Sequence, residues 1–324
     1  MLQALHTIKR PRIGIPRGLL FYTLGESWRR FFCEIGCEVI TSPETTADIL
    51  RQGIRHAGSD LCLPVKTFLG HVESLRESAD LLFIPRYVSV ETESFMCPKM
   101  IGLPDVVRAC FTSLPGILAP MFHLKQSGDS AIAEFTGPVA KALHMGKAAV
   151  EAAFRNHMGH SDEVADEQRR QSERLLNEDS GIISSHRKMN IGIAGRPYLL
   201  FDGYLSKNLF RCIRDLGANP VFIKPCEADI REAMSVIPKW VYWDMGKEVV
   251  TAAHTFFLDD RIDGVINVCS ATCGPDSFTG DLIRKRLNQR QKPYMSLSLD
   301  EHASDVGIRT RIEAFIDMIS RVTA

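Results

Sequence analysis

One pattern that occurs twice along the chain constrains the fold more than any other feature. Residues 11–40 read PRIGIPRGLLFYTLGESWRRFFCEIGCEVI, and residues 189–223 read MNIGIAGRPYLLFDGYLSKNLFRCIRDLGANPVFI. Each stretch has an apolar IGI strand, a turn with Pro, Gly and Arg, a Leu-Leu-Phe segment, a helix, and a glycine before a second strand. The sequence therefore predicts two copies of one α/β unit.

The segments between and after these copies continue the alternation of strands and helices. Further strands are predicted over 79–86, 116–122, 262–270 and 292–300, and further helices over 46–54, 64–78, 103–113, 276–289 and 308–322. Such alternation is typical of parallel sheets that carry helices on both faces. The predicted fold class is α/β, with two doubly wound, Rossmann-like parallel-sheet domains and a helical connector.

The strand signal disappears between residues 127 and 188. Helices are predicted over 137–158 and 161–180, and the second is so highly charged that it should face water. We therefore expect an N-terminal α/β domain over 1–126, a helical connector over 127–188 and a C-terminal α/β domain over 189–324. Two doubly wound domains that face each other would form a cleft in which a ligand can bind.

Charge and hydropathy narrow the class of partner. Lys plus Arg and Asp plus Glu each total 39, so the formal net charge is zero. A neutral chain has no general attraction to nucleic acid or to an acidic membrane. No apolar run approaches the roughly 18 residues of a membrane span, and the first residues lack the apolar core of a signal peptide. We expect a cytoplasmic protein with no membrane partner, whose nine cysteines stay reduced.

Three cysteines share one local setting. Cys62 lies in DLCLPVK, Cys97 in FMCPKM and Cys273 in TCGPDS, and each has a proline one or two positions later. Proline is favoured in the first turn of a helix, so each thiol should lie at a helix N-terminus, where free N–H groups stabilise the thiolate that binds metals. Gly274 would start the helix that directs N–H groups towards the Cys273 sulfur. The alternative, three partly buried thiols without a ligand, remains open at this point.

Three converging thiolates would suit zinc or an iron–sulfur cluster, since both select sulfur ligands. Sequence patterns of zinc sites show tight pairs of cysteines, whereas these three are far apart and come from both predicted domains. That spread fits a [4Fe–4S] cluster in the cleft better. Lys66 and Lys99 lie close to the ligands in sequence and could offset the negative charge of a cluster, or could equally be solvated.

The other cysteines are assigned differently. Cys269 could share one side of an extended chain with Cys273 and act as a ligand, or could pack within its strand. We expect the remaining five to be core or near-core residues: Cys33, Cys37, Cys110, Cys212 and Cys226. No P-loop is present, so the chain should not hydrolyse ATP by that route.

Several motifs resemble a known family. CLPVKTFLGHV, IPRYVSVE, CPKMIGLPDVV, CGPDSFTGDLI and LDEHASDVGIRTRIEAF look like those of the acyl-CoA dehydratase activase-related proteins. That family is akin to the cluster-binding subunits of 2-hydroxyacyl-CoA dehydratase and benzoyl-CoA reductase and to the double-cubane cluster proteins. The resemblance covers nearly the whole chain and is weakest over 127–188. It implies a cluster between two α/β domains, with Cys62, Cys97 and Cys273 as its ligands and one iron left open.

The resemblance also implies a function. Relatives receive low-potential electrons from a separate ATP-dependent iron–sulfur activator, so we expect this chain to accept electrons and to reduce or dehydrate a small or CoA-linked substrate. A double-cubane [8Fe-9S] cluster would need more thiolates than the motifs supply, unless a homodimer or a related cluster-binding subunit shares it. Two alternatives stay open: a non-enzymatic cluster carrier or electron-relay scaffold, and a metal-free protein that binds an anion through Arg17, Arg86 and Arg196.

Overall fold

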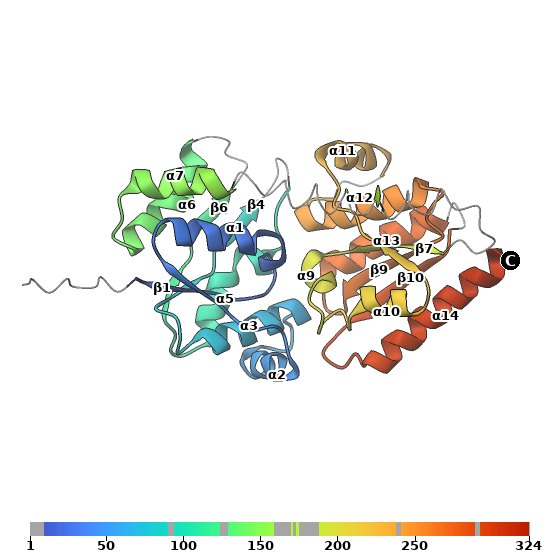
Figure 1. The fold of residues 1–324 in the computed structure, drawn as a ribbon, viewed down its shortest axis with the longest axis horizontal. Helices are drawn as coiled ribbons and strands as arrows, with labels where there is room; N and C mark the ends of the chain where they lie inside the picture. Colours follow the sequence, from blue (N-terminus) through green and yellow to red (C-terminus); the bar gives the residue numbers. More distant parts are fainter. Residues whose placement is uncertain are drawn as a thin grey trace, which may run out of the picture.

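The computed structural model describes residues 10–89, 94–123, 129–158, 170, 173–174, 188–237, 241–288 and 292–323. These residues form two α/β halves that lie side by side (Figure 1). The charged helix predicted over 161–180 falls almost entirely outside the described residues.

The N-terminal half is built on a four-stranded parallel sheet. Its strands are β1 (Arg12–Ile15), β2 (Glu38–Thr41), β3 (Leu81–Phe83) and β5 (Gly116–Leu118), in the order β2-β1-β3-β5. The first crossover is α1 (Phe21–Glu34), and the second is the pair α2 (Ala47–His56) and α3 (Leu63–Leu75). Parallel neighbours joined by helices are the predicted doubly wound arrangement.

Two prolines divide the later strands of this half. The predicted strand over 79–86 ends at Phe83 and resumes as β4 (Arg86–Ser89), and the one over 116–122 ends at Leu118 and resumes as β6 (Met121–His123). β4 and β6 pair with each other as a separate two-stranded parallel sheet. Pro85 and Pro120 stand at the two breaks, and because proline has no N–H to donate, it interrupts a sheet ladder.

The C-terminal half has a second four-stranded parallel sheet. Its strands are β7 (Asn190–Gly195), β8 (Asn219–Val221), β9 (Gly264–Ser270) and β10 (Tyr294–Leu299), in the order β10-β9-β7-β8. β1 and β7 each pair with the strand that ends their own copy of the repeated unit, β2 and β8 respectively. The predicted fold class, α/β with two parallel-sheet halves, is therefore confirmed.

The two copies also end their helices in the same way. Gly36 follows α1 with a φ of 85°, and Gly217 follows α10 (Leu209–Asp215) with a φ of 83°. The N–H groups of Gly36 and Gly217 donate to Cys33 and Arg214, which closes the last turn of each helix. Glycine adopts this left-handed conformation without a steric penalty, so it ends both helices and redirects the chain into the next strand.

Helices α6 (Asp129–Ala142) and α7 (Lys147–Met158) pack against α1 and β6 of the N-terminal half (Figure 1). Their contact is aromatic: the ring of Phe135 lies 5.8 Å from that of Phe31 and 4.8 Å from that of Phe154, centroid to centroid. The predicted helix over 137–158 is thus two helices, separated by a turn in which His144 has a positive φ. The domain boundaries at 126 and 188 remain predictions.

The C-terminal sheet is covered by further helices. α10 and α14 (Asp305–Thr323) pack together, and α11 (Glu227–Val236) and α13 (Gly274–Asn288) pack on α12 (Asp244–Leu258). The sequence interpretation contained neither α11 nor α12. α12 is buried along most of its length, so it lacks the alternation of polar and apolar faces that makes a helix visible in a sequence.

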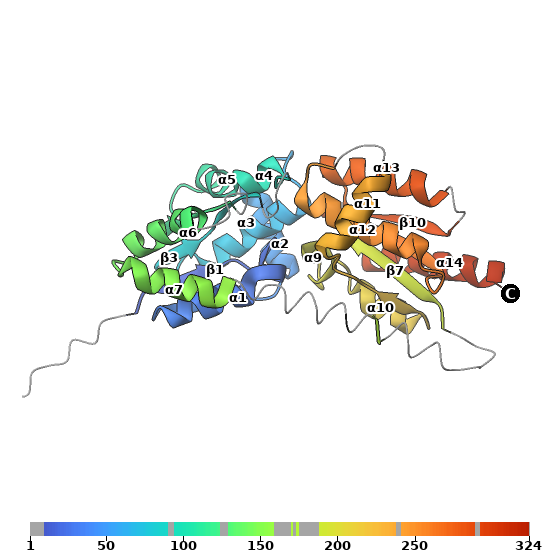
Figure 2. The ribbon, with the colours of Figure 1, turned by 90° about the horizontal axis from the view of Figure 1, so that it is seen from above.

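Polar contacts at several places join the halves in the part of the chain that the structure describes. The Lys66 ammonium lies 2.6 Å from Glu301 Oε1, the Tyr22 hydroxyl donates to Asp202 Oδ2 at 2.9 Å, and the Phe95 N–H donates to the Tyr242 carbonyl at 2.8 Å. The short helix α9 (Pro197–Leu200), which follows β7, packs against α1 at this junction (Figure 2). The carboxyl ends of both sheets' central strands therefore lead into the junction.

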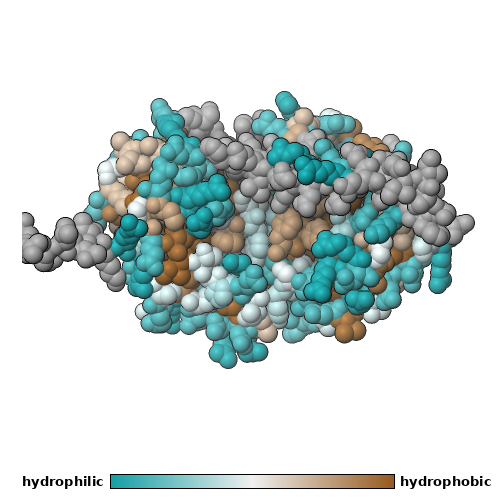
Figure 3. Space-filling model, viewed as in Figure 1, coloured by the Kyte–Doolittle hydropathy of each residue, from teal (hydrophilic) through white to brown (hydrophobic). Residues whose placement is uncertain are grey.

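The surface offers no extended apolar face in the view of Figure 3, where apolar groups are scattered among hydrophilic ones over both halves. Scattered apolar groups are normal on a folded chain. Within the described residues, none of the helices combines the length and the apolar character that crossing a bilayer requires.

Candidate metal centre

Each of the three predicted ligand cysteines directly precedes a helix. Cys62 precedes α3, Cys97 precedes α4 (Pro98–Ile101) and Cys273 precedes α13. The carbonyls of Cys62 and Cys97 accept the first helical hydrogen bonds, from Lys66 and Ile101, and that of Cys273 accepts one from Ser277. The structure therefore confirms that each thiol lies at a helix N-terminus, as predicted.

The three thiols lie within electrostatic reach of one another. Burial raises the pKa of Cys62, and the negative charge of Cys97 raises it further. Burial also raises the pKa of Cys273, to about 12, and the charge of Cys62 contributes to this rise. A thiol with so high a pKa keeps its proton at neutral pH unless a cation binds, which distinguishes this site from the low-pKa thiolates of nucleophilic cysteines.

The three thiols do not lie close enough together to bind one metal ion. Among the residues that the structure describes, no group of three or more His, Cys, Asp or Glu side chains is close enough to hold one ion. A cluster makes a different demand, because each thiolate binds a different iron of a [4Fe–4S] unit and the sulfurs need not meet at one point.

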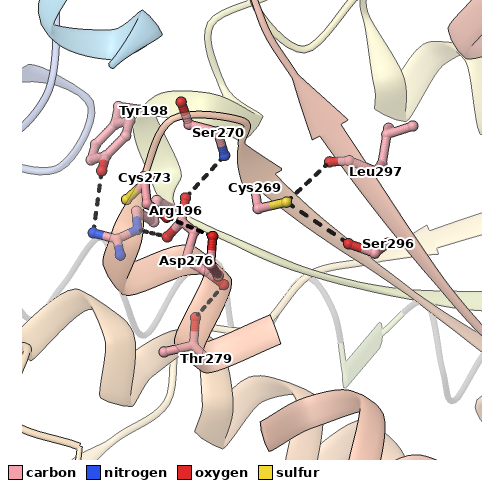
Figure 4. A network of polar contacts seen from close by, with 10 residues as sticks. Arg196, Tyr198, Cys269, Ser270, Cys273, Asp276, Thr279, Ser296 and Leu297 are labelled. Carbon is pink, nitrogen blue, oxygen red and sulfur yellow. Dashed lines mark hydrogen bonds and ion pairs between the residues drawn. The ribbon is translucent and has the colours of Figure 1, made fainter. Parts of the chain in front are cut away.

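Arg196 is the charged side chain at the centre of this site. It directly follows β7, whose last residue pairs with Val268 of β9, and it is 3% exposed. Its Nε donates to Asp276 Oδ1 at 2.6 Å, and its Nη1 donates to the Tyr198 hydroxyl at 3.3 Å. The Nη2 atom is buried and has no hydrogen-bond partner among the residues that the structure describes. Figure 4 shows the Cys273 side chain on the side of Arg196 and Tyr198.

The electrostatics keep this guanidinium charged. Burial alone would lower the pKa of Arg196, but the neighbouring Tyr198, the Asp276 carboxylate and the thiols of Cys273 and Cys97 outweigh burial, and the pKa is raised well above its usual value. In return, the charge of Arg196 lowers the pKa of Cys273. A positive charge is therefore fixed among thiols contributed by both halves.

Asp276 holds the guanidinium in place. Its Oδ2 accepts the N–H of Ser270 at 3.0 Å while its Oδ1 accepts Arg196 Nε. Because Ser270 ends β9 and Arg196 follows β7, the carboxylate joins the ends of two adjacent strands (Figure 4).

Cys269 points away from this site. Its sulfur lies 3.8 Å from both Ser296 Oγ and the Leu297 carbonyl oxygen on β10, and Figure 4 shows it turned away from Cys273. Of the two roles left open by the sequence, the structure favours packing within the strand. Gly274 is the first residue of α13, and a Cβ built there would meet no atom of the described residues within 4 Å, its chain neighbours and the backbone of its own helix aside.

The two predicted lysines differ in their surroundings. The ammonium of Lys66 is buried and engaged by Glu301. Lys99 donates to the carbonyl oxygen of Asp60, and its charge lowers the pKa of Cys62. Lys99 is therefore the lysine whose charge reaches a predicted ligand, and a cofactor-binding role for Lys66, Lys99 or Gly274 remains a prediction.

The expectation for the remaining cysteines is correct only in part. Cys37 and Cys212 are buried and Cys110 is half-buried, but Cys33 and Cys226 are exposed. Cys33 lies on the outer face of α1, and Cys226 is the N-cap of α11, where its N–H donates to Asp229 at 2.8 Å. Cys226 is exposed although an apolar stretch of the sequence precedes it, so the expectation of a near-core position was wrong for it.

Each of the three arginines named in the anion-binding alternative forms an ion pair with a carboxylate. Arg17 lies 3.5 Å from Glu44, Arg86 lies 2.5 Å from Asp105, and Arg196 is paired with Asp276. The sequence interpretation had named Arg196 in the anion-binding alternative, but it had missed Asp276 and Tyr198. The available signal for Asp276 was its place three residues after Cys273, in the first turn of a predicted helix.

The fold and the site define an α/β protein of two parallel-sheet halves that has cysteines at helix N-termini in both halves. The chain belongs to the family described as CoA enzyme activase uncharacterised domain, whose model matches residues 12–224 and thus more than half of the chain. Residues 247–319 match a second model, that of the 2-hydroxyglutaryl-CoA dehydratase D-component. The first match includes Cys62 and Cys97, and the second includes Cys273. The comparison with curated proteins gives no match.

Proposed function

We propose that the protein holds a [4Fe–4S] cluster between its halves through Cys62, Cys97 and Cys273. The observation that supports this proposal is that three thiols, each directly before a helix and drawn from both halves, interact electrostatically with one another and with the buried Arg196. The donor set fits the group, because sulfur ligands are those that iron–sulfur clusters use. The unpartnered Nη2 of Arg196 adds a hydrogen-bond donor that is ready for an acceptor.

The residues of the chain would act as follows. The three thiols release their protons when the cluster binds, since only thiolates are ligands. Arg196 offsets the negative charge of the thiolates, and the helix N-termini behind the cysteines contribute partial positive charge. The cluster itself supplies low-potential one-electron transfer.

The family relation supports a reaction and a partner. In this proposal an ATP-dependent iron–sulfur activator delivers electrons, and the protein uses them to reduce or dehydrate a small or CoA-linked substrate in the cytoplasm. With three cysteine ligands, one iron would be left without a protein ligand and could take substrate. A homodimer or a related cluster-binding subunit would be needed for an [8Fe-9S] cluster.

Metal analysis of protein purified without oxygen tests the proposal. About four irons per chain with matching acid-labile sulfide supports one cubane, and about eight supports the double cubane. Zinc without sulfide would contradict the cluster. No metal after reconstitution would favour the anion-binding alternative, and turnover with reductant and activator separates an enzyme from a carrier.

A matched pair of variants tests the ligand set. Cys273→Ala should abolish retention of iron and sulfide. Cys269→Ala removes a thiol only four positions away that points to β10, so it should retain the wild-type iron content. Full iron in the Cys273 variant would remove Cys273 from the ligands.

A further inference from the structure

Arg196 carries a buried hydrogen-bond donor that lacks an acceptor within the described part of the chain. Two nitrogens of its guanidinium are bonded, Nε to Asp276 and Nη1 to Tyr198, whereas Nη2 has no partner among the described residues. A buried donor on a charged group without an acceptor is costly. The side chain is 3% exposed and held from two sides, so it cannot turn to solvent to satisfy Nη2.

The surroundings of Arg196 indicate which hydrogen-bond acceptor its Nη2 would contact. Cys273 and Cys97 interact electrostatically with Arg196, and the charge of Arg196 lowers the pKa of Cys62. All three proposed ligands are therefore within its electrostatic reach. Arg196 also stands at the carboxyl end of β7, the edge at which open α/β sheets bind their ligands.

We infer that Arg196 donates a hydrogen bond from Nη2 to a sulfur of the cluster and thereby sets the reduction potential of that cluster. This inference rests on the proposed function and adds to it the residue that tunes the site. Reduction adds one negative charge to a cluster. A fixed cation and an N–H donor at its sulfur stabilise the reduced state and make the potential less negative. Asp276 is the positioning residue, because its hydrogen bond fixes the orientation of the guanidinium.

The test measures potential rather than activity. Arg196→Gln alone would leave Asp276 buried without its cation, so the variant to use is the pair Arg196→Gln with Asp276→Asn. A redox titration followed by EPR, on protein with known iron content, gives the midpoint. At the wild-type midpoint, the ratio of reduced to oxidised cluster should fall at least tenfold, which is a shift of 59 mV for a one-electron couple.

The chain provides a matched control. Arg12 and Asp80 form another Arg–Asp pair, 2.8 Å apart, but Arg12 starts β1 and so lies at the opposite edge of its sheet from the cysteines. Arg12→Gln with Asp80→Asn removes the same two charges and should leave the midpoint unchanged. An equal shift in both double variants would overturn the assignment to Arg196.

The remaining outcomes are also decisive. If the double variant Arg196→Gln with Asp276→Asn retains its iron and the wild-type midpoint potential, the inference is overturned but the proposed cluster is not. If that variant loses its iron, Arg196→Lys keeps the charge and loses the planar fork of donors, and it should shift the midpoint in the same direction by less. If both the double variant and Arg196→Lys lose their iron, Arg196 is needed to retain the cluster, and the inference that it tunes the reduction potential is overturned. A wild-type protein without iron and sulfide overturns the proposed function itself.

Discussion

The ammonium of Lys66 lies 2.6 Å from a carboxylate oxygen of Glu301, so helix α3 of the N-terminal half is tied to the residues that follow β10 in the C-terminal half. Lys66 is four positions after Cys62 in the first turn of α3. This ion pair therefore fixes one predicted ligand relative to the half that supplies another.

Replacement of Glu301 should destabilise the protein in a pH-dependent way. Glu301→Gln leaves the buried Lys66 without a carboxylate, which should lower the free energy of unfolding at pH 7 by about 1–3 kcal/mol. The hydrogen bond from Lys66 lowers the pKa of Glu301. The stabilisation is therefore present above the usual glutamate pKa of about 4.3 and is lost as the pH falls through the lower folded value.

Urea unfolding at pH 7 and in acid would measure this difference. Glu77→Gln is the control, because that side chain is 96% exposed and reaches only a weak contact with Arg76. Equal stability of the Glu301 variant and the wild type at pH 7 would show that the pair contributes nothing to the junction.

The buried His71 should make stability fall between pH 6.5 and pH 5. Its ring nitrogens lie 3.0 Å from Ser42 Oγ and 3.0 Å from Thr45 Oγ1, and burial, aided by the charge of Arg17, lowers its pKa to about 3. The unfolded chain, with a histidine pKa of about 6.5, binds the proton first. Stability is therefore full above pH 6.5, and about 2 kcal/mol is lost by pH 5.

The comparison of unfolding curves at pH 7.5 and pH 5 should show a flatter pH response for His71→Gln. His302→Gln changes an exposed side chain and should keep the wild-type response. A His71 variant with an unchanged slope over this range would assign the loss to other groups.

The glycine that ends α1 should resist substitution for a purely conformational reason. A Cβ at Gly36 would meet no atom within 4 Å, but the φ of 85° is left-handed. Gly36→Ala should therefore cost about 1–2 kcal/mol. Gly137 also has open space around it but lies inside α6, so Gly137→Ala should stabilise by up to about 1 kcal/mol. Thermal unfolding of both variants checks the opposite signs.

Alkylation of the native protein should separate the cysteines into three groups. Exposed Cys33 and Cys226 should react first, and buried Cys37 and Cys212 last. Cys62, Cys97 and Cys273 should be protected in protein that contains iron and should react after the iron is removed. Mass spectrometry of peptides reads out each position, and equal labelling of these three with and without iron would argue against their role as ligands.

The repeated unit explains why so much of the fold was predictable. Strand, turn, helix and terminal glycine are local features, so Gly36 and Gly217 identified both helix ends directly. The division of strands at Pro85 and Pro120 was harder to predict, because it depends on two prolines that meet only when distant strands pair.

The centre of the site was predictable only in its local parts. A cysteine followed by proline specifies a helix start, which holds for Cys62, Cys97 and Cys273. The pairing of Arg196 with Asp276 joins residues 80 positions apart, and no local pattern encodes it. The exposure of Cys226 was likewise not predictable from its position before a helix, because Cys62 and Arg196 also precede helices and are less exposed.

The repetition of the α/β unit lets the chain be compared with itself. Arg17 and Arg196 follow the first strand of the two copies at nearly the same place. The first is partly exposed beside Glu44, whereas the second is enclosed beside Asp276. The corresponding position is thus half-buried in one copy and enclosed in the other. The site is asymmetric although the α/β unit that frames it is repeated.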